Sequence, residues 1–152
     1  METLLFPLTM LVLMTIHESG HIGSAKLMGL RITSIGLMMK PIPHPFVAIK
    51  WSSSRPKVLV FFFAGVALTV LQFSLLLGYR FFDQPIIYFA FCAQLILETN
   101  PFYSDFTLAV RFMEYPRKTE YQYTLLWYLH ISFWVALIVV LLSKRFLYGA
   151  LF

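Results

Sequence analysis

The chain has 152 residues, of which 59% are hydrophobic and only 12% charged, and its formal net charge is +5. A water-soluble domain of this length has too little interior to bury so much apolar surface, so the composition favours a single membrane domain, 1–152. The positive charge does not predict nucleic-acid binding, because no basic face with interleaved aromatic residues lies on a soluble element.

The first predicted element is a helix over residues 4–28. It begins as an apolar run and continues through a polar stretch, "HESGH". Because residues 1–3 contain an acid and no Lys or Arg, we expect a retained first helix rather than a signal peptide. Residues 31–57 follow as a strand-like loop. Its prolines in "KPIPHP" exclude a helix, and the β-branched and aromatic flanks at 32–39 and 46–51 predict two short strands.

Three more apolar helices are predicted at 58–80, 85–102 and 123–145. Stretches 58–77 and 123–142 are long enough to cross a hydrocarbon core of about 30 Å. The third helix ends in polar residues before Pro101, and 104–122 is a mixed stretch with a surface loop at 114–120. Cys92 lies in an apolar run, where packing is the expected role. The predicted fold is an all-α polytopic membrane protein with about four transmembrane helices and a short β-hairpin-like loop.

Basic residues indicate the orientation of these four helices. Most of the lysines and arginines fall in the 31–57 and 106–122 loops, and fewer lie on the other side, at Arg80, Lys144 and Arg145. The positive-inside rule therefore places both loops in the cytoplasm and both termini outside. We expect an integral protein of a membrane such as the bacterial cytoplasmic membrane.

The polar stretch in the first helix carries the chemistry. His17 and His21 are four residues apart, so on a helix both imidazoles lie on one face and can bind one Zn²⁺ ion. Glu18 follows the first histidine and suits a general base acting on water, the arrangement of a zinc hydrolase. The alternative is a pair of packed histidines with Glu18 paired to a lysine. Placing an ionisable residue within a membrane helix costs about 3 kcal/mol, and this stretch has three of them. A bound metal would compensate for that cost, so the membrane setting favours the metal interpretation.

A catalytic zinc site needs a third protein ligand. Glu98 and Asp105 flank the end of the third helix, His44 lies in the proline loop, where we expect exposure, and His130 lies among aromatic residues, which favours packing. His21 lies about 10 Å before the cytoplasmic end of its helix at 1.5 Å per residue, and the third helix ends on that side. Asp105 is therefore the best third ligand, and a helix cap is its alternative role.

These motifs resemble the site-two protease family of intramembrane zinc metalloproteases. Members carry HExxH on one core helix and an Asn-Pro…Asp-Gly motif on a later one, which "HESGH" and "NPFYSD" match in type and order. The stretch after the motif, with its small residues and a glycine before a strand-like segment, is also similar to the family's. The resemblance covers the first three helices. Phe106 stands where the family usually has glycine, and Val66 and Thr69 stand where a Gly-Pro-x-x-Asn pattern has proline and asparagine.

The resemblance implies an intramembrane zinc endopeptidase that cuts a membrane-anchored protein or peptide in or near its embedded segment. It implies His17, His21 and Asp105 as ligands of one Zn²⁺, Glu18 as the catalytic base, and Asn100 as a donor to the substrate or oxyanion, with capping of the broken helix as the alternative for Asn100. The predicted strands could pair with an unwound substrate.

Other interpretations stay open at this point. The small residues Gly20, Gly23 and Ser24 suit either substrate access or helix packing. The departures at Val66, Thr69 and Phe106 motivate a catalytically inactive pseudoprotease that binds a membrane partner. A metal or proton transporter ranks last, because the polar residues cluster toward one side of the membrane. The sequence identifies neither the substrate nor the oligomeric state.

Overall fold

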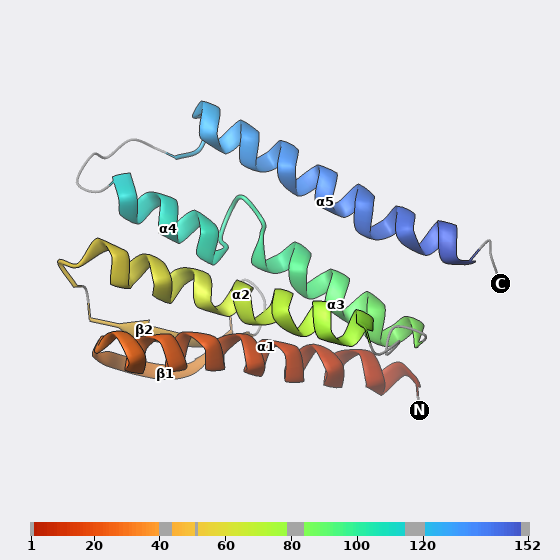
Figure 1. Ribbon diagram of the computed structural model, residues 1–152, viewed down its shortest axis with the longest axis horizontal. Helices are drawn as coiled ribbons and strands as arrows, with labels where there is room; N and C mark the ends of the chain where they lie inside the picture. The colour runs from red at the N-terminus through yellow and green to blue at the C-terminus, as the bar shows by residue number, and fades with distance from the viewer. Residues whose placement is uncertain (1, 40–43, 51, 79–83, 115–120, 150–152) are drawn as a thin grey trace. The chain divides into compact units, whose positions relative to one another are not determined.

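The computed structural model describes residues 2–39, 44–50, 52–78, 84–114 and 121–149 (Figure 1). This part of the chain is mostly helical and contains one two-stranded sheet. In chain order its elements are α1 (Glu2–Met28), β1 (Ile32–Met38), β2 (His44–Ile49), α2 (Arg55–Gly78), α3 (Pro85–Glu98), α4 (Asp105–Glu114) and α5 (Leu125–Gly149).

The internal contacts divide the chain into two compact units, Met1–Leu95 and Ile96–Phe152, so the boundary falls within the last turn of α3. Each unit is described by itself below. The prediction of a single domain stays a prediction.

In the first unit, α1 and α2 lie side by side (Figure 1). A glycine allows their close approach, because a Cβ atom at Gly20 would lie 2.7 Å from the Ala64 carbonyl oxygen on α2. The helix α1 ends at Met28 and is followed by Gly29, whose φ of 66° suits a residue without a Cβ. The Gly29 and Leu30 amides donate to the Lys26 and Ala25 carbonyls, which is a Schellman ending.

The predicted hairpin is confirmed, with antiparallel pairing that runs from Ile32 opposite Ile49 to Met38 opposite His44. Its second strand contacts α1. The expectation that His44 is exposed was wrong, because the residue begins β2 and is partly buried. Pro45 also lies in this strand, which is possible because each strand of a two-stranded sheet has an open edge that needs no amide donor.

In the second unit, α3 ends at Glu98, earlier than the predicted 102. Pro101 disfavours the helical conformation at Asn100 and has no N–H to donate. A new helix, α4, begins at Asp105, within the stretch that was predicted to be mixed and polar. Most of the predicted surface loop, 115–120, lies outside the described residues. A buried cluster contains Val110 of α4, Tyr121 of the segment before α5 and Trp127 of α5, with Ile131 packed against them.

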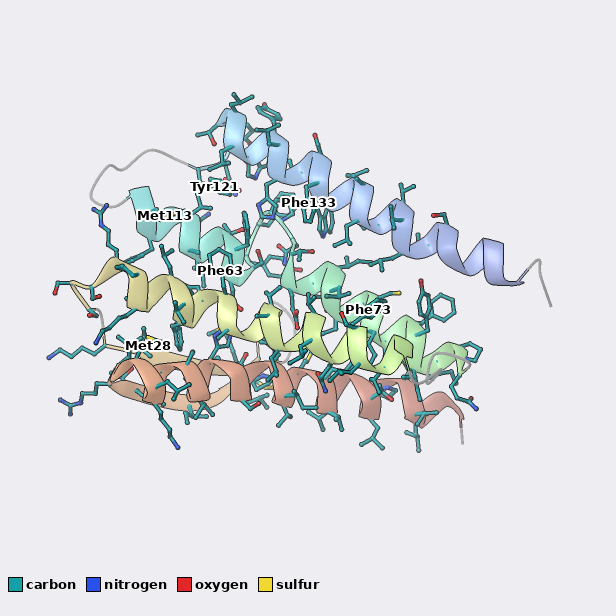
Figure 2. All side chains as sticks on the ribbon, viewed as in Figure 1. Met28, Phe63, Phe73, Met113, Tyr121 and Phe133 are labelled. Atoms are coloured by element: carbon teal, nitrogen blue, oxygen red, sulfur yellow. The ribbon has the colours of Figure 1, made fainter. Side chains whose placement is uncertain are left out.

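Among the described residues, two helical segments are long and apolar enough to cross a membrane, Arg55–Leu76 and Leu125–Ser143. The apolar helix α3 is shorter than these two. The described helices therefore support two membrane-crossing segments and not the predicted four. Only 28% of the first segment and 11% of the second are buried within the protein, whereas the core helix of a soluble domain would be mostly buried. Exposed apolar side chains include Phe63 on α2 and Phe133 on α5 (Figure 2).

Candidate metal centre

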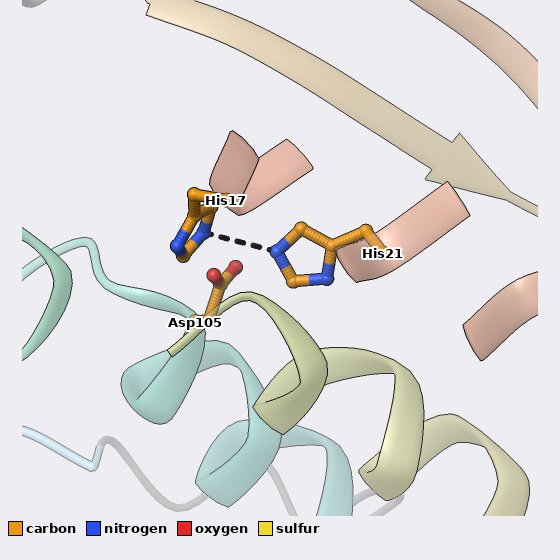
Figure 3. A group of neighbouring side chains, drawn as sticks. All are labelled: His17, His21 and Asp105. Atoms are coloured by element: carbon orange, nitrogen blue, oxygen red, sulfur yellow. Dashed lines mark hydrogen bonds between the residues drawn. The ribbon is translucent and has the colours of Figure 1, made fainter. Parts of the chain in front are cut away.

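His17 and His21 lie one helical turn apart on α1, and both are buried, with 6% and 3% of their surface exposed. Their Nε2 atoms are 3.1 Å apart (Figure 3). Two ligand atoms held about 2.1 Å from a tetrahedral ion would be about 3.4 Å apart, so the ring nitrogens already have nearly the spacing that zinc requires. The predicted convergence of the two imidazoles is confirmed.

The backbone of α2 determines which nitrogen of His21 is available. The His21 Nδ1 atom lies 2.7 Å from the Phe61 carbonyl oxygen, which can only accept a hydrogen bond. Nδ1 therefore carries the hydrogen in a neutral ring, and the lone pair is on Nε2, which faces His17. A carbonyl that orients a ligand histidine in this way is the usual outer partner in metal sites.

Gly65 on α2 provides the space in which these two nitrogens meet. A Cβ atom at this position would lie 2.5 Å from His17 Nε2 and 2.6 Å from His21 Nε2, far inside van der Waals contact. Gly65 was not predicted to line the metal site. The available signal was a glycine in the middle of an otherwise apolar span, which also suits ordinary helix packing.

Asp105 is the first residue of α4 and is half-buried. One ligand atom each from His17, His21 and Asp105 lie within 4.8 Å of one another (Figure 3). Two imidazole nitrogens and one carboxylate oxygen match the donor set that zinc takes in hydrolases. These three residues could therefore hold a metal ion, as predicted.

Glu18 is half-buried and follows the first candidate ligand on α1. Consecutive residues on a helix are about 100° apart around its axis, so Glu18 lies beside the face that carries His17 and His21 rather than on it. Among the described residues, the group of possible ligands contains neither Glu18 nor the other three candidates, His44, Glu98 and His130. Glu98 is buried at the end of α3.

Asn100 has the capping arrangement that was its alternative role. Its Oδ1 atom accepts hydrogen bonds from the Phe102 and Tyr103 amides, at 3.0 and 2.9 Å, and its Nδ2 atom donates to the Leu97 carbonyl. The side chain is buried and closes the broken end of α3. A role for Asn100 as a donor to substrate stays a prediction.

The small residues near the motif differ in their surroundings. Gly20 lies against the α2 backbone and is used for packing, and Ser24 is buried with its hydroxyl donating to the His21 carbonyl. Gly23 has open space around the position of a Cβ atom, with nothing within 4 Å. The packing alternative therefore holds for Gly20, and Gly23 alone keeps room for an approaching chain.

Comparison of the chain with protein-family models, curated proteins and solved structures returned no match. The resemblance to site-two proteases therefore rests on the two motifs and their order along the chain.

Proposed function

We propose that this protein is an intramembrane zinc endopeptidase of the site-two protease type, which hydrolyses a peptide bond in a membrane-anchored protein or peptide. The observation that carries the proposal is the meeting of His17, His21 and Asp105 ligand atoms within 4.8 Å, with Glu18 next to the first of them. The same three residues follow from the motifs, and a cluster with an adjacent glutamate suits hydrolysis better than metal storage.

In this proposal His17 Nε2, His21 Nε2 and the Asp105 carboxylate hold one zinc ion. A zinc ion bound there supplies Lewis acidity, which polarises a carbonyl group and lowers the pKa of water toward neutrality. The Glu18 carboxylate accepts the proton of the attacking water and passes it to the leaving nitrogen as the C–N bond breaks. The Phe61 carbonyl keeps His21 in the tautomer that leaves Nε2 available.

The membrane setting is proposed from composition, exposure and charge. The two long apolar helices are mostly unburied within the protein, which suits contact with lipid. Four membrane-crossing segments would require α1 and the short α3 to cross as well, with both ends of the chain outside and the site near the cytoplasmic face. A substrate helix must unwind before cleavage, and the exposed strand β1 is available for pairing with it.

The proposal is tested by separating metal binding from proton transfer. We expect the purified full chain to contain one zinc per molecule by mass spectrometry, and His17→Ala and His21→Ala to lose it. Glu18→Gln should keep the zinc and lose the cleavage. Cleavage is detected by labelling new protein N-termini in membranes of cells that express either the original chain or Glu18→Gln. New termini in apolar segments that appear equally with Glu18→Gln would refute the hydrolase mechanism.

A zinc-binding pseudoprotease is the second candidate. The observation that favours it is at Thr69, where the resembled family has asparagine. Thr69 is fully buried, and its hydroxyl donates to the Gly65 carbonyl one turn earlier on α2, at 3.3 Å. This bond uses the single hydrogen of the hydroxyl, whereas an asparagine amide at the same position would have two N–H donors. Zinc in stoichiometric amount with no new N-termini in any membrane protein would favour this candidate.

A further inference from the structure

The end of α3 leaves carbonyl groups that need donors, because the last turn of a helix has no amides beyond it. Two of these carbonyls receive ring N–H groups from α5. Trp134 Nε1 donates to the Ile96 carbonyl at 2.8 Å, and His130 Nε2 donates to the Thr99 carbonyl at 2.8 Å. His130 and Trp134 are one turn apart on α5, so they lie on one face of that helix.

The hydrogen bonds of His130 have a definite direction. The Thr99 carbonyl can only accept, so His130 Nε2 carries the hydrogen and Nδ1 carries the lone pair in the neutral ring. The Tyr121 hydroxyl, 2.7 Å from Nδ1, is then the donor. Both side chains are buried, with 5% of His130 and 2% of Tyr121 exposed. The chain of bonds therefore runs from Tyr121 through His130 to the backbone at Thr99.

The Thr99 carbonyl that His130 binds lies at the start of the turn that leads to Asp105. Thr99 is followed by Asn100, whose side chain binds the Phe102 and Tyr103 amides. The Asn100 carbonyl accepts from the Ser104 and Thr107 hydroxyls, which lie on either side of Asp105.

A second contact of His130 lies on the other side of Asp105. The ring of Phe106, the next residue, lies with its centroid 4.5 Å from that of His130. His130 thus contacts the chain both before and after the segment that presents the carboxylate.

We infer that His130 is a positioning residue for the Asp105 carboxylate, acting through the Thr99 carbonyl and the Phe106 ring. The inference rests on the proposed function, since it gives Asp105 a task that needs a fixed position. It also gives Phe106 a role in this chain, where the resembled family has glycine: the aromatic ring is the surface against which His130 packs.

The test compares His130→Phe with Trp134→Phe in the purified full chain. Both variants keep an aromatic ring and remove one N–H donor to the end of α3. Only His130→Phe frees the carbonyl nearest Asp105. We expect His130→Phe to weaken Co²⁺ binding about 10- to 100-fold, the usual range for outer-shell partners, and to alter the visible absorption of the bound Co²⁺. Trp134→Phe should change affinity by no more than about twofold, and His130→Gln, which keeps an N–H donor, should recover most of the loss.

A measurement without metal distinguishes this inference from the proposed function. Hydrogen exchange of the Phe102, Tyr103 and Thr107 amides should become about tenfold faster in His130→Phe and stay unchanged in Trp134→Phe, with no metal present. Equal Co²⁺ affinities and spectra for the two variants would overturn the inference and leave the zinc site standing. Conversely, an original chain that binds no Co²⁺ but shows faster exchange in His130→Phe would overturn the proposed function while supporting His130 as the residue that orders the turn.

Discussion

Replacing Gly65 by alanine tests whether the space between His17 and His21 is a metal site. The added Cβ atom would lie 2.5 Å from His17 Nε2 and 2.6 Å from His21 Nε2. Carbon contacts are normally about 3.5 Å or longer, so the two rings would have to withdraw by about 1 Å. Zinc ligands hold their distances within about 0.2 Å, so a shift of this size removes the geometry for binding.

The expected loss of zinc affinity is at least about 100-fold, measured by competition with a chromophoric chelator. Stability should change much less. Alanine improves helix propensity over glycine by about 1 kcal/mol. Overpacking usually costs about 1–3 kcal/mol, so the net destabilisation is about 0–2 kcal/mol. The melting temperature without metal should therefore fall by no more than about 8 °C.

Gly23→Ala is the matched control, because it lies on α1 two residues after His21 and has nothing within 4 Å of its Cβ position. It should bind zinc as the original chain does and be slightly more stable. Unchanged zinc affinity in Gly65→Ala would refute the argument that both imidazoles meet a metal beside α2. An equal loss of zinc affinity in Gly65→Ala and Gly23→Ala would also refute it, since such a loss would indicate a general effect of alanine in these helices.

Three further predictions follow from single contacts. Zinc at 100 times its dissociation constant should stabilise the chain by about 2.7 kcal/mol in thermal unfolding, and His21→Ala should abolish this effect; stabilisation that survives the substitution would place the metal elsewhere. Gly29→Ala should cost about 1 kcal/mol and Gly29→Asn less, because φ is 66° there; equal stabilities would contradict the left-handed ending. Lys57→Met should cost at most about 1 kcal/mol, since the Nζ atom donates to the Met28 carbonyl at 2.9 Å from an exposed position; a larger loss would mean that the lysine has another role.

Several features of this protein follow from the sequence because they depend on residues close together in the chain. The four-residue spacing of His17 and His21 places them on one helix face whatever surrounds them. Gly29 ends α1 by its backbone freedom, and Pro101, which has no amide hydrogen, marks the break after α3, although the helix itself ends earlier than predicted, at Glu98. The prolines of the 41–45 stretch exclude a helix and leave a hairpin. These outcomes are decided within one or two turns of backbone.

The sequence did not predict α4, because its mixed polar and apolar residues are too few to give a clear helical pattern. It favoured packing for His130, and the structure adds the hydrogen bonds to Tyr121 and Thr99 that define its surroundings. It also left open whether Asn100 caps α3. For His130, the partners lie 9 and 31 residues away in the chain, so their positions depend on how the chain folds back.

The same limit applies at the metal centre. By itself, the sequence determined which residues could hold a metal ion: two histidines on one face of α1 and an aspartate after the break in α3. Only the tertiary structure decided how α2 lies against α1, which brings the Phe61 carbonyl to His21 and the bare backbone of Gly65 to both rings. A carbonyl and a glycine have no side-chain signature, and their contribution depends on the register of two packed helices, which local residue patterns do not specify.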